Sequence, residues 1–538
     1  MQHVRQNCVA EWTCTSGAPY PDPGNDVTLD VVVTAPGGQE RRVPAFWAGD
    51  QTWGVRYAAP ELGTHAWRTV CSDAGNPDLH DRRGTLEVLP YEGANPLHQH
   101  GRLRLASHGR HLEHADGTPF FWLGDTWWMG FTRRLPWPEG FRELAADRVA
   151  KGFTLVQIVA GLYPDMEPFD ERGANEAGFP WEKDFSRLNP AYFDMVDLKV
   201  AHLVRVGLVP CIVGSWGYFL DFAGPEVLRR HWRNLIARYG AYPVVWCAAG
   251  EALMGYYVKK APPQDPEAAK RATRAGWTEM VRAIRAMDPF GNPVTIHPTR
   301  FGHEQVDDAT LLDVDMLQTG HSGYASLAPT VDSVEQALAH QPRRPVVVSE
   351  VNYEGIMESS REEVQRFAFW TTMLSGAAGH TYGANGIWQV NTREQPYGIS
   401  PHGTSWGNLP WDEAYRLPGS GQLGLAKRLL ERYPWWEFQP HLEWVEPHQT
   451  REKRISVYAA GVPGKVRVLF IPAETCWAAW GGNMTVKDLE TGVRYRARYV
   501  DPKTGEEHDL GPVPASAEGQ FTVPKPPVFQ DWLLILEA

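Results

Sequence analysis

Two glutamates stand where catalytic carboxylates would be expected, each at the end of an apolar run typical of a buried strand. Glu251 closes the run Val-Val-Trp-Cys-Ala-Ala-Gly-Glu, and Glu350 closes Pro-Val-Val-Val-Ser-Glu. Two carboxylates can cleave a glycosidic bond when one serves as acid and base and the other as nucleophile. In a (β/α)8 barrel the active site lies at the carboxyl ends of the strands. The pair therefore predicts a retaining glycoside hydrolase built on such a barrel.

The two roles require different surroundings. Glu251 follows an apolar run and Gly250, a setting expected to raise the pKa of a carboxyl group and keep it protonated, as a general acid must be. Glu350 must be ionised, and it therefore needs hydrogen-bond donors. The ends of neighbouring strands offer three candidates for this: His321, Tyr324 and Tyr382. In the alternative interpretation, each glutamate only pairs with an arginine at the barrel rim.

Other side chains near strand ends could bind sugar hydroxyls or stack on a sugar ring. Asp125, in Leu-Gly-Asp-Thr-Trp-Trp, could do the former or could simply cap the next turn. The aromatic candidates for stacking are Trp127, Trp128, Tyr163, Trp216, Tyr218 and Trp388. The predicted substrate-binding set also contains His297, His321, Tyr324 and Tyr382. We expect the segment 161–188 and the one that carries His402 and Trp406 to form walls of the pocket.

Eight strand-like runs that alternate with helical patterns must position these residues. The runs are 120–128, 154–160, 208–214, 244–249, 293–297, 316–319, 345–349 and 379–388. Start signals mark the helices between them, as where Asn189 is expected to cap a helix that Pro190 opens. A doubly wound open sheet would alternate in the same way, but its Gly-rich phosphate turn after the first strand is missing. The pattern therefore predicts an α/β fold of the (β/α)8 TIM-barrel type.

The 538 residues are too many for one core, and both ends of the chain alternate with the period of two that is typical of strands. We therefore predict an N-terminal β-sandwich over 1–92, the catalytic barrel over 93–440 and a C-terminal β-sandwich over 441–538.

Composition narrows the choice of partner. The chain has 52 basic and 64 acidic residues, a net charge of −12 and no polybasic run, which disfavours nucleic acid and anionic membranes. The 23 tryptophans suit a carbohydrate substrate, and a homo-oligomer is possible. No apolar stretch has the length of a membrane span, and the N-terminus lacks the core of a signal peptide. We therefore expect a cytoplasmic protein, or a secreted or periplasmic one if a leader was removed.

Other chemistries find little support in the sequence. The six cysteines lack metal-ligand spacing, and the His-x-His of His98 and His100 falls in the segment between the predicted domains. We therefore predict no metal and no cofactor. Two alternatives stay open. One is a non-catalytic carbohydrate-binding barrel. The other is a glycan lyase. It would need a basic pocket to bind the carboxylate of a uronate, and the strand ends offer little basic charge.

Three segments together resemble the apiosidase-like glycoside hydrolases, which are similar to the clan A barrels. They are Phe121-Trp-Leu-Gly-Asp-Thr-Trp-Trp128, Glu350-Val-Asn-Tyr-Glu-Gly355 and Ala377-Ala-Gly-His-Thr-Tyr-Gly-Ala-Asn-Gly-Ile-Trp388. The flanking domains are similar to the immunoglobulin-like domain and the domain labelled collagen-binding in that family. The resemblance implies a retaining glycosidase that removes a terminal or branching sugar from plant or microbial oligosaccharides or polysaccharides, with Glu350 as nucleophile and residue 251 as acid/base. Many members have Asp where this chain has Glu251. The longer Glu251 side chain is therefore expected to place the acid group differently relative to the leaving group.

Overall fold

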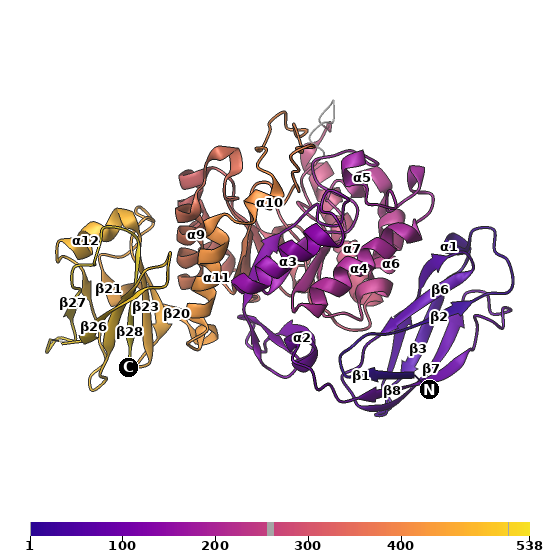
Figure 1. The fold of residues 1–538 in the computed structure, drawn as a ribbon, viewed down its shortest axis with the longest axis horizontal. Coiled ribbons are helices and arrows are strands. Elements are labelled where there is room, and N and C mark those ends of the chain that lie inside the picture. Colours follow the sequence, from indigo (N-terminus) through magenta and orange to yellow (C-terminus); the bar gives the residue numbers. More distant parts are fainter. Residues whose placement is uncertain (1, 256–262, 515) are drawn as a thin grey trace.

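The structure is a computed structural model that describes residues 2–255, 263–514 and 516–538. A parallel barrel lies in the middle, and a β-sheet domain flanks it on each side (Figure 1). The predicted TIM barrel between two β-sandwich domains is confirmed. Among the described residues, no helix is both long enough and apolar enough to cross a bilayer.

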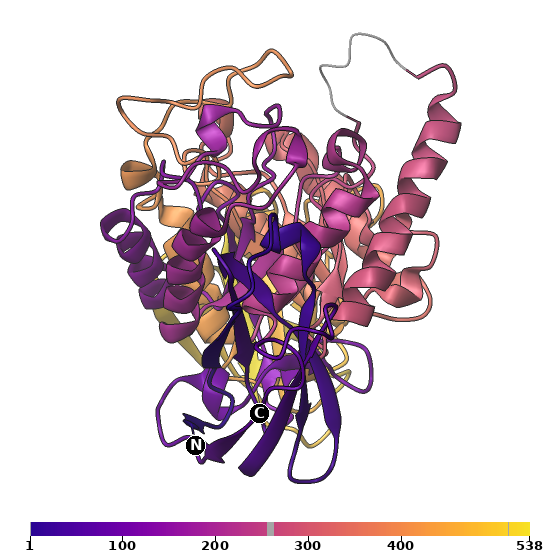
Figure 2. The same cartoon turned by 90° about the vertical axis from the view of Figure 1, so that its right-hand side faces the viewer.

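The N-terminal domain consists of two sheets around one apolar core. Figure 2 views the molecule from the side of this domain. The first sheet has the order β1-β8-β7-β3-β4 and the second β2-β6-β5. Their strands are β1 Gln2–Arg5, β2 Ala10–Thr15, β3 Leu29–Thr34, β4 Glu40–Pro44, β5 Phe46–Gly49, β6 Thr52–Tyr57, β7 Gly63–Cys71 and β8 Arg83–Leu89. Alternate residues such as Val31 and Val33 of β3 and Val55 of β6 are buried between the sheets, which is the physical basis of the period-two pattern.

Within the described residues, the barrel is an eight-stranded sheet of order β16-β15-β14-β13-β12-β19-β18-β17. Its strands are β12 Trp122–Thr126, β13 Leu155–Val159, β14 Val209–Val213, β15 Val245–Cys247, β16 Val294–Thr295, β17 Asp315–Gln318, β18 Val346–Glu350 and β19 Gly379–Tyr382. The two ends of this order meet where the Asp313 amide donates to the Val294 carbonyl at 2.8 Å and the Thr295 hydroxyl to the Val314 carbonyl at 2.8 Å. Every predicted barrel strand therefore has a counterpart.

The last strand is shorter than predicted. We expected it to continue to Trp388, but β19 ends at Tyr382. Only glycine fits at position 383, since a Cβ atom there would lie 2.0 Å from the Tyr353 ring. Gly386 has a φ of 94°, a left-handed conformation that turns the chain away from the strand direction.

Helices surround the barrel. The longer ones are α3 Glu139–Lys151, α4 Pro190–Arg205, α6 Pro225–Tyr239, α7 Pro266–Met287, α8 Leu327–Ala339, α9 Glu362–Leu374 and α11 Pro418–Leu430. Helix α4 starts at Pro190 as predicted, but the Asn189 side chain does not cap it. The Asn189 amide donates instead to the carbonyls of Ala177 and Phe179, and so ties the long loop after β13 to the helix.

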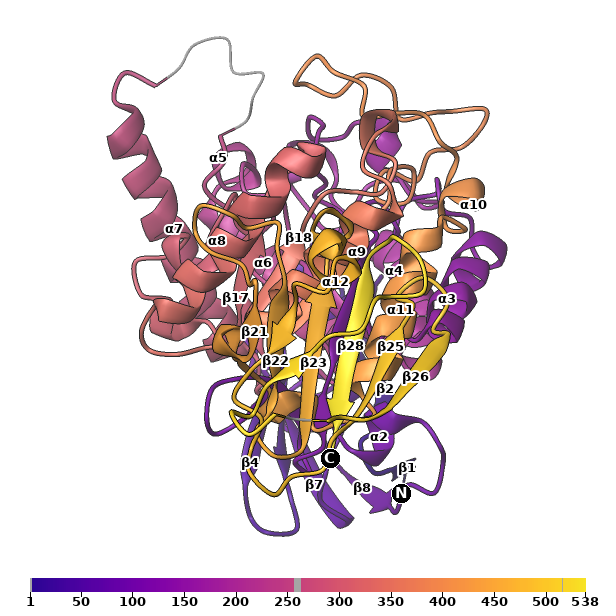
Figure 3. The same cartoon turned by 90° about the vertical axis from the view of Figure 1, so that its left-hand side faces the viewer.

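The C-terminal domain packs against α9 with a six-stranded sheet of order β20-β22-β23-β28-β25-β26 (Figure 3). Its strands are β20 Gln439–Pro440, β22 Tyr458–Val462, β23 Val466–Ile471, β25 Arg496–Val500, β26 Glu507–Pro512 and β28 Trp532–Glu537. A smaller sheet contains β21 Val445–Glu446, β24 Thr485–Val486 and β27 Phe521–Thr522. Because β20 pairs with β22, the C-terminal sheet starts at Gln439, two residues before the predicted boundary. The buried pair Arg366–Asp531, at 2.6 Å, fixes α9 to this domain.

Candidate active site

A cavity of about 240 Å³ opens at the carboxyl ends of the barrel strands. Both glutamates predicted to be catalytic line it. In the part of the chain that the structure describes, the residues that line it are Trp128, Pro164, Asp165, Trp216, Glu251, Met254, Gln318, His321, Glu350, Tyr353, Ile356, Trp388, His402 and Trp406. Aromatic walls with a few convergent polar groups are typical of small-molecule sites.

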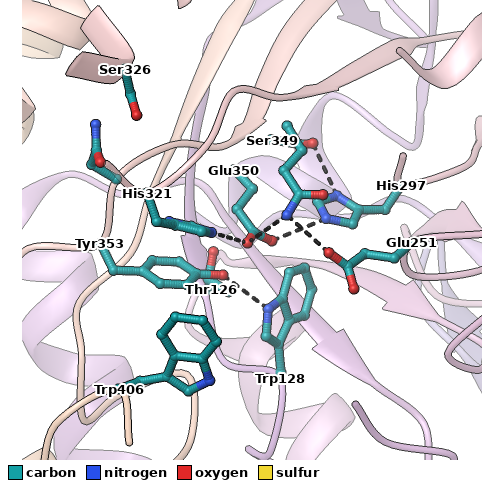
Figure 4. A network of polar contacts seen from close by, with 12 residues as sticks. Thr126, Trp128, Glu251, His297, His321, Ser326, Ser349, Glu350, Tyr353 and Trp406 are labelled. Atoms are coloured by element: carbon teal, nitrogen blue, oxygen red, sulfur yellow. Dashed lines mark hydrogen bonds and ion pairs between the residues drawn. The ribbon is translucent and has the colours of Figure 1, made fainter. Parts of the chain in front are cut away.

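Glu350 is the last residue of β18 and is only 5% exposed. His321 Nε2 donates to its Oε1 at 2.7 Å, and Gln318 Nε2 lies 3.2 Å from the same oxygen. His297 Nε2 lies 3.0 Å from Oε2 (Figure 4). Burial by itself raises the pKa of this carboxyl group, but the contacts with His297 and His321 outweigh it and lower the pKa to about 2. Glu350 is therefore ionised at neutral pH.

The position of Gln318 depends on an irregularity in the sheet. The register of β17 against β18 shifts between Leu317 and Gln318, so that Leu317 pairs with Val348 but Gln318 pairs with Glu350. A bulge of this kind changes the direction of a side chain relative to its neighbours. Here it places the Gln318 amide against the carboxylate of Glu350.

Glu251 lies four residues beyond the end of β15 and has a φ of 45°. This left-handed conformation costs about 1–2 kcal/mol for a residue other than glycine. The preceding Gly250 is required by packing, since a Cβ atom there would lie 2.2 Å from the Trp216 ring. The carboxylate accepts from Trp216 Nε1 at 3.1 Å and from Gln318 Nε2 at 3.0 Å.

The surroundings of Glu251 favour its protonated form. Burial is the largest cause, and the negative charge of Glu350 adds to it, so that the pKa of Glu251 is raised to about 7. The hydrogen bond from Gln318 acts in the opposite direction but is weaker. The two carboxyl groups thus have pKa values on either side of the ordinary value, which is the pattern expected of an acid and a nucleophile.

Aromatic rings form the walls of the cavity. Trp128 Nε1 donates to the Tyr353 hydroxyl at 3.0 Å, and the Tyr353 ring stacks against His321 with centroids 4.7 Å apart. Trp388 stacks against Tyr353 at 5.9 Å. On another side Trp406 Nε1 donates to Asp165 Oδ2 at 3.2 Å, which joins the loops after β19 and β13 across the site.

Four of the predicted substrate-binding residues line the cavity: Trp128, Trp216, His321 and Trp388. His297 is fully buried behind Glu350 and contacts it. Six others lie outside the cavity: Asp125, Trp127, Tyr163, Tyr218, Tyr324 and Tyr382.

We expected Asp125 to bind sugar, but its side chain points away from the cavity. Its Oδ2 accepts from Arg148 Nε at 2.5 Å and from Trp127 Nε1 at 2.7 Å, and Asp125 and Trp127 are both 0% exposed. Arg148 belongs to α3, so Asp125 faces the helix layer. Side chains of a strand alternate between its two faces, and Asp125 lies on the face away from the pocket.

Tyr382 also faces the helix layer rather than the pocket, because it lies on the same face of the sheet as Asp125. It is the register partner of Asp125 on the neighbouring strand, and Arg148 lies 5.6 Å from its ring centroid. Its hydroxyl donates to Glu354 Oε2 at 2.5 Å, and therefore does not orient Glu350 as we expected.

The three other tyrosines also bond elsewhere. The hydroxyls of Tyr163 and Tyr192 lie 2.7 Å apart in a buried pair, and the Tyr218 hydroxyl donates to the Tyr163 carbonyl at 2.7 Å. Tyr324 donates to Glu363 at 2.8 Å and is 53% exposed. Tyr163 and Tyr218 thus shape the loop after β13, while Tyr324 lies on the surface.

Asp165, His402 and Trp406 line the cavity, as expected for the two segments predicted to wall it, but sequence reasoning missed Gln318 and Tyr353. Gln318 is a polar residue at the end of a barrel strand, the same signal that identified the two glutamates, so it could have been found. Tyr353 lies inside the segment that carries the family resemblance. Within the predicted wall segment 161–188, the sequence context of Asp165 does not distinguish it from the other carboxylates of that loop.

No group of three or more potential metal ligands comes together among the described residues. The His-x-His pair is held by other contacts. His98 Nδ1 lies 3.1 Å from the Asn7 carbonyl, and His100 Nδ1 lies 2.7 Å from Asp116.

The family model described as "Apiosidase-like, catalytic domain" matches residues 106–437. A second model, a domain of unknown function (DUF5060), matches residues 3–72. No curated protein matches the sequence.

Solved structures share the fold. One described as a glycoside hydrolase is 21% identical with a TM-score of 0.66, and the match covers 83% of this chain and 98% of that one. A glycoside hydrolase family 5 protein from Bacteroides vulgatus is 20% identical with a TM-score of 0.66, covering 83% of this chain and 94% of its own. A candidate glycoside hydrolase from the same bacterium is 15% identical with a TM-score of 0.69 and covers 100% of both chains.

Proposed function

This chain belongs to the apiosidase-like family, and we propose that it hydrolyses glycosides with retention of configuration, Glu350 acting as nucleophile and Glu251 as acid and base. The family match supports glycosidase activity. The observation that carries the finer proposal is the pair of buried carboxyl groups in one cavity with pKa values of about 7 and about 2.

In the first step Glu251 gives its proton to the glycosidic oxygen while the Glu350 carboxylate attacks the anomeric carbon. The bond to the leaving group breaks as the bond to Glu350 forms, which leaves a covalent glycosyl ester and an ionised Glu251. Esterification also removes the charge of Glu350. Because that charge helps to raise the pKa of Glu251, its loss lowers the pKa at the stage when Glu251 must act as a base.

In the second step Glu251 takes a proton from a water molecule, whose oxygen attacks the anomeric carbon and releases Glu350. Two inversions give net retention. The Gln318 contacts support this assignment over inversion. One Gln318 nitrogen lies 3.0 Å from a Glu251 oxygen and 3.2 Å from a Glu350 oxygen, so these oxygens cannot be farther apart than the sum of those distances. This limit applies to one pair of oxygens, and it suits the roughly 5–5.5 Å between the carboxyl groups of retaining enzymes better than the roughly 6.5–9.5 Å of inverting ones.

The cavity supports a substrate in which one sugar enters the site. Its volume of about 240 Å³ is small, and the indoles of Trp128, Trp216 and Trp388 offer apolar faces to a sugar ring. We therefore propose removal of a terminal or branching sugar from a plant or microbial oligosaccharide or polysaccharide.

The test is hydrolysis of nitrophenyl pyranosides and furanosides of both anomers by the wild-type chain and by Glu350→Ala with added azide. We expect the substitution to lower turnover about a thousandfold or more. Azide should then restore turnover and give a glycosyl azide whose anomeric configuration is opposite to that of the substrate. Turnover by Glu350→Ala at the wild-type rate would refute the proposal.

The chain offers a matched control in Glu354, a second buried glutamate with a pKa raised to about 7 by burial. It lies outside the cavity and accepts hydrogen bonds from Tyr382 and from the Gly419 amide. Glu354→Gln should keep wild-type turnover, whereas Glu251→Gln and Glu350→Gln should lose it. Sugar binding that is equally strong in all four proteins, with no turnover in any, would identify a binding protein instead.

A further inference from the structure

Three aromatic side chains form an exposed cluster on the C-terminal domain: Trp477, Trp480 and Phe529, called here the aromatic patch. Trp477 and Trp480 belong to α12 Cys476–Trp480, and Phe529 lies in the segment before β28. Trp477 is 66% exposed and Phe529 is 42% exposed, although both are large and apolar. Their ring centroids are 4.6 Å apart at 54°, and Trp480 lies 5.9 Å from Phe529.

Buried contacts hold both supporting segments. Cys476 and Ala479, on the inner side of α12, are 0% exposed. In the other segment Trp532 Nε1 donates to the Val528 carbonyl at 2.9 Å, and Asp531 pairs with Arg366 of α9 at 2.6 Å. The rings are therefore presented by a fixed framework, so little conformational entropy is lost when a ligand binds to them.

The patch lies toward the catalytic side of the barrel. Helix α9 follows β18, so it begins at the end of the barrel that carries Glu350, and Arg366 lies in its second turn. Figures 1 and 3 both show α12 at the upper end of the C-terminal domain.

Tyr324 connects the pocket loop with α9. It follows His321, which lines the cavity, by three residues, and its hydroxyl bonds to Glu363 at the start of α9. Arg366 of the same helix pairs with Asp531, two residues after Phe529 of the patch, so the pocket loop and the patch segment are both attached to α9.

We propose that the aromatic patch binds a carbohydrate chain whose terminal or branching sugar enters the pocket. The exposed rings of Trp477 and Phe529, set at an angle to one another, suit successive sugar units, whose C–H faces stack on aromatic faces. The Trp480 ring borders them, with Lys525 Nζ 3.8 Å from its centroid. A protein partner fits less well. Three partly exposed rings offer only a few hundred Å², whereas a stable interface takes about 800 Å² from each partner. This inference rests on the proposed function for the choice of a carbohydrate, but binding to the patch does not need turnover.

The test is affinity electrophoresis of the full chain with Glu350→Gln, to prevent turnover, in native gels that contain arabinan, xylan, xyloglucan, galactomannan or pectin. At least one polysaccharide should retard the protein. Adding Trp477→Ala should weaken the affinity at least about fivefold, while Trp477→Phe should keep most of it because a ring remains. Leu198→Ala, which changes an apolar residue of α4 that is 46% exposed, should have no effect.

Absence of retardation in every gel would overturn the proposal, as would equal retardation with and without Trp477. Conversion of a dimer to a monomer by Trp477→Ala, measured by light scattering, would overturn it in favour of a second copy of the chain. Measurements of activity with Glu350 intact distinguish failure of carbohydrate binding by the patch from failure of the proposed catalytic function. Trp477→Ala should leave kcat/KM on nitrophenyl glycosides unchanged and lower it on the retarding polysaccharide. Failure of catalysis would appear on both kinds of substrate.

Discussion

Glu251 and Glu350 share one hydrogen-bond donor, an amide nitrogen that lies 3.0 Å from the first carboxyl group and 3.2 Å from the second. The nitrogen belongs to Gln318 and carries two hydrogens, so it can serve both. The shared donor links the acid to the nucleophile across the cavity. It lowers the pKa of Glu251, against the larger effects of burial and of the Glu350 charge.

The pH dependence of kcat/KM should show the opposite shifts of the two carboxyl groups. Glu251 must be protonated, so activity should fall as the pH rises through about 7, the raised pKa of this group. Glu350 must be ionised, so the fall at acid pH should occur only as the pH approaches about 2. The profile of kcat/KM reports these groups in the free enzyme.

A substrate with a dinitrophenyl leaving group provides the control for this profile, since such a group leaves without protonation. With Glu251→Gln and this substrate, the fall above neutral pH should disappear. If the same fall persists in the variant, another group is the acid.

Removal of the shared donor should move the profile in a defined direction. In Gln318→Leu the pKa of Glu251 should rise, because a contact that lowers it is lost, and the alkaline limb of the profile should move to higher pH. We expect kcat/KM at the optimum to fall about tenfold, as two buried carboxyl groups lose a hydrogen bond. Gln336→Leu, which changes an exposed glutamine of α8, should alter neither quantity. A downward shift of the limb in Gln318→Leu would contradict this account.

Asp125 and Arg148 should matter for stability rather than for substrate binding. Both side chains are 0% exposed, and Arg148→Met would leave the Asp125 carboxylate buried without this partner. Breaking a buried pair on one side costs about 3–5 kcal/mol. Thermal denaturation should therefore show a clear loss of stability, while kcat/KM per folded molecule should change less than about threefold.

A double variant separates this role from a catalytic one. Asp125→Leu with Arg148→Met removes both charges, so its loss of stability should be smaller than the sum of the two single losses. A large rise in KM for Asp125→Asn with unchanged stability would instead restore the role in sugar binding that we expected from the sequence.

The sequence by itself was sufficient for the barrel and for the positions of Glu350 at the end of one strand and of Glu251 just beyond another. Apolar runs of strand length, helix start signals and the residue that ends each run are local properties, and each can be recognised without knowing its neighbours in space. In the flanking domains the same holds for strands such as β2 and β7, in which more buried and more exposed residues alternate.

Tertiary structure decided which face of a strand each side chain occupies. Asp125 and Tyr382 stand near strand ends as Glu350 does, but they are partners in register on the opposite face and bond within the helix layer. A shift of one residue changes the face, and an apolar run buried on both faces carries no pattern that reveals it.

Tertiary structure also decided the contacts that give the two glutamates different pKa values. Gln318 reaches Glu350 only because the register shifts after Leu317. The pairing of Asp165 with Trp406 joins loops that are far apart in sequence. Such contacts depend on strand register and loop paths, which are set by the packing of the whole barrel, and no short stretch of sequence specifies them.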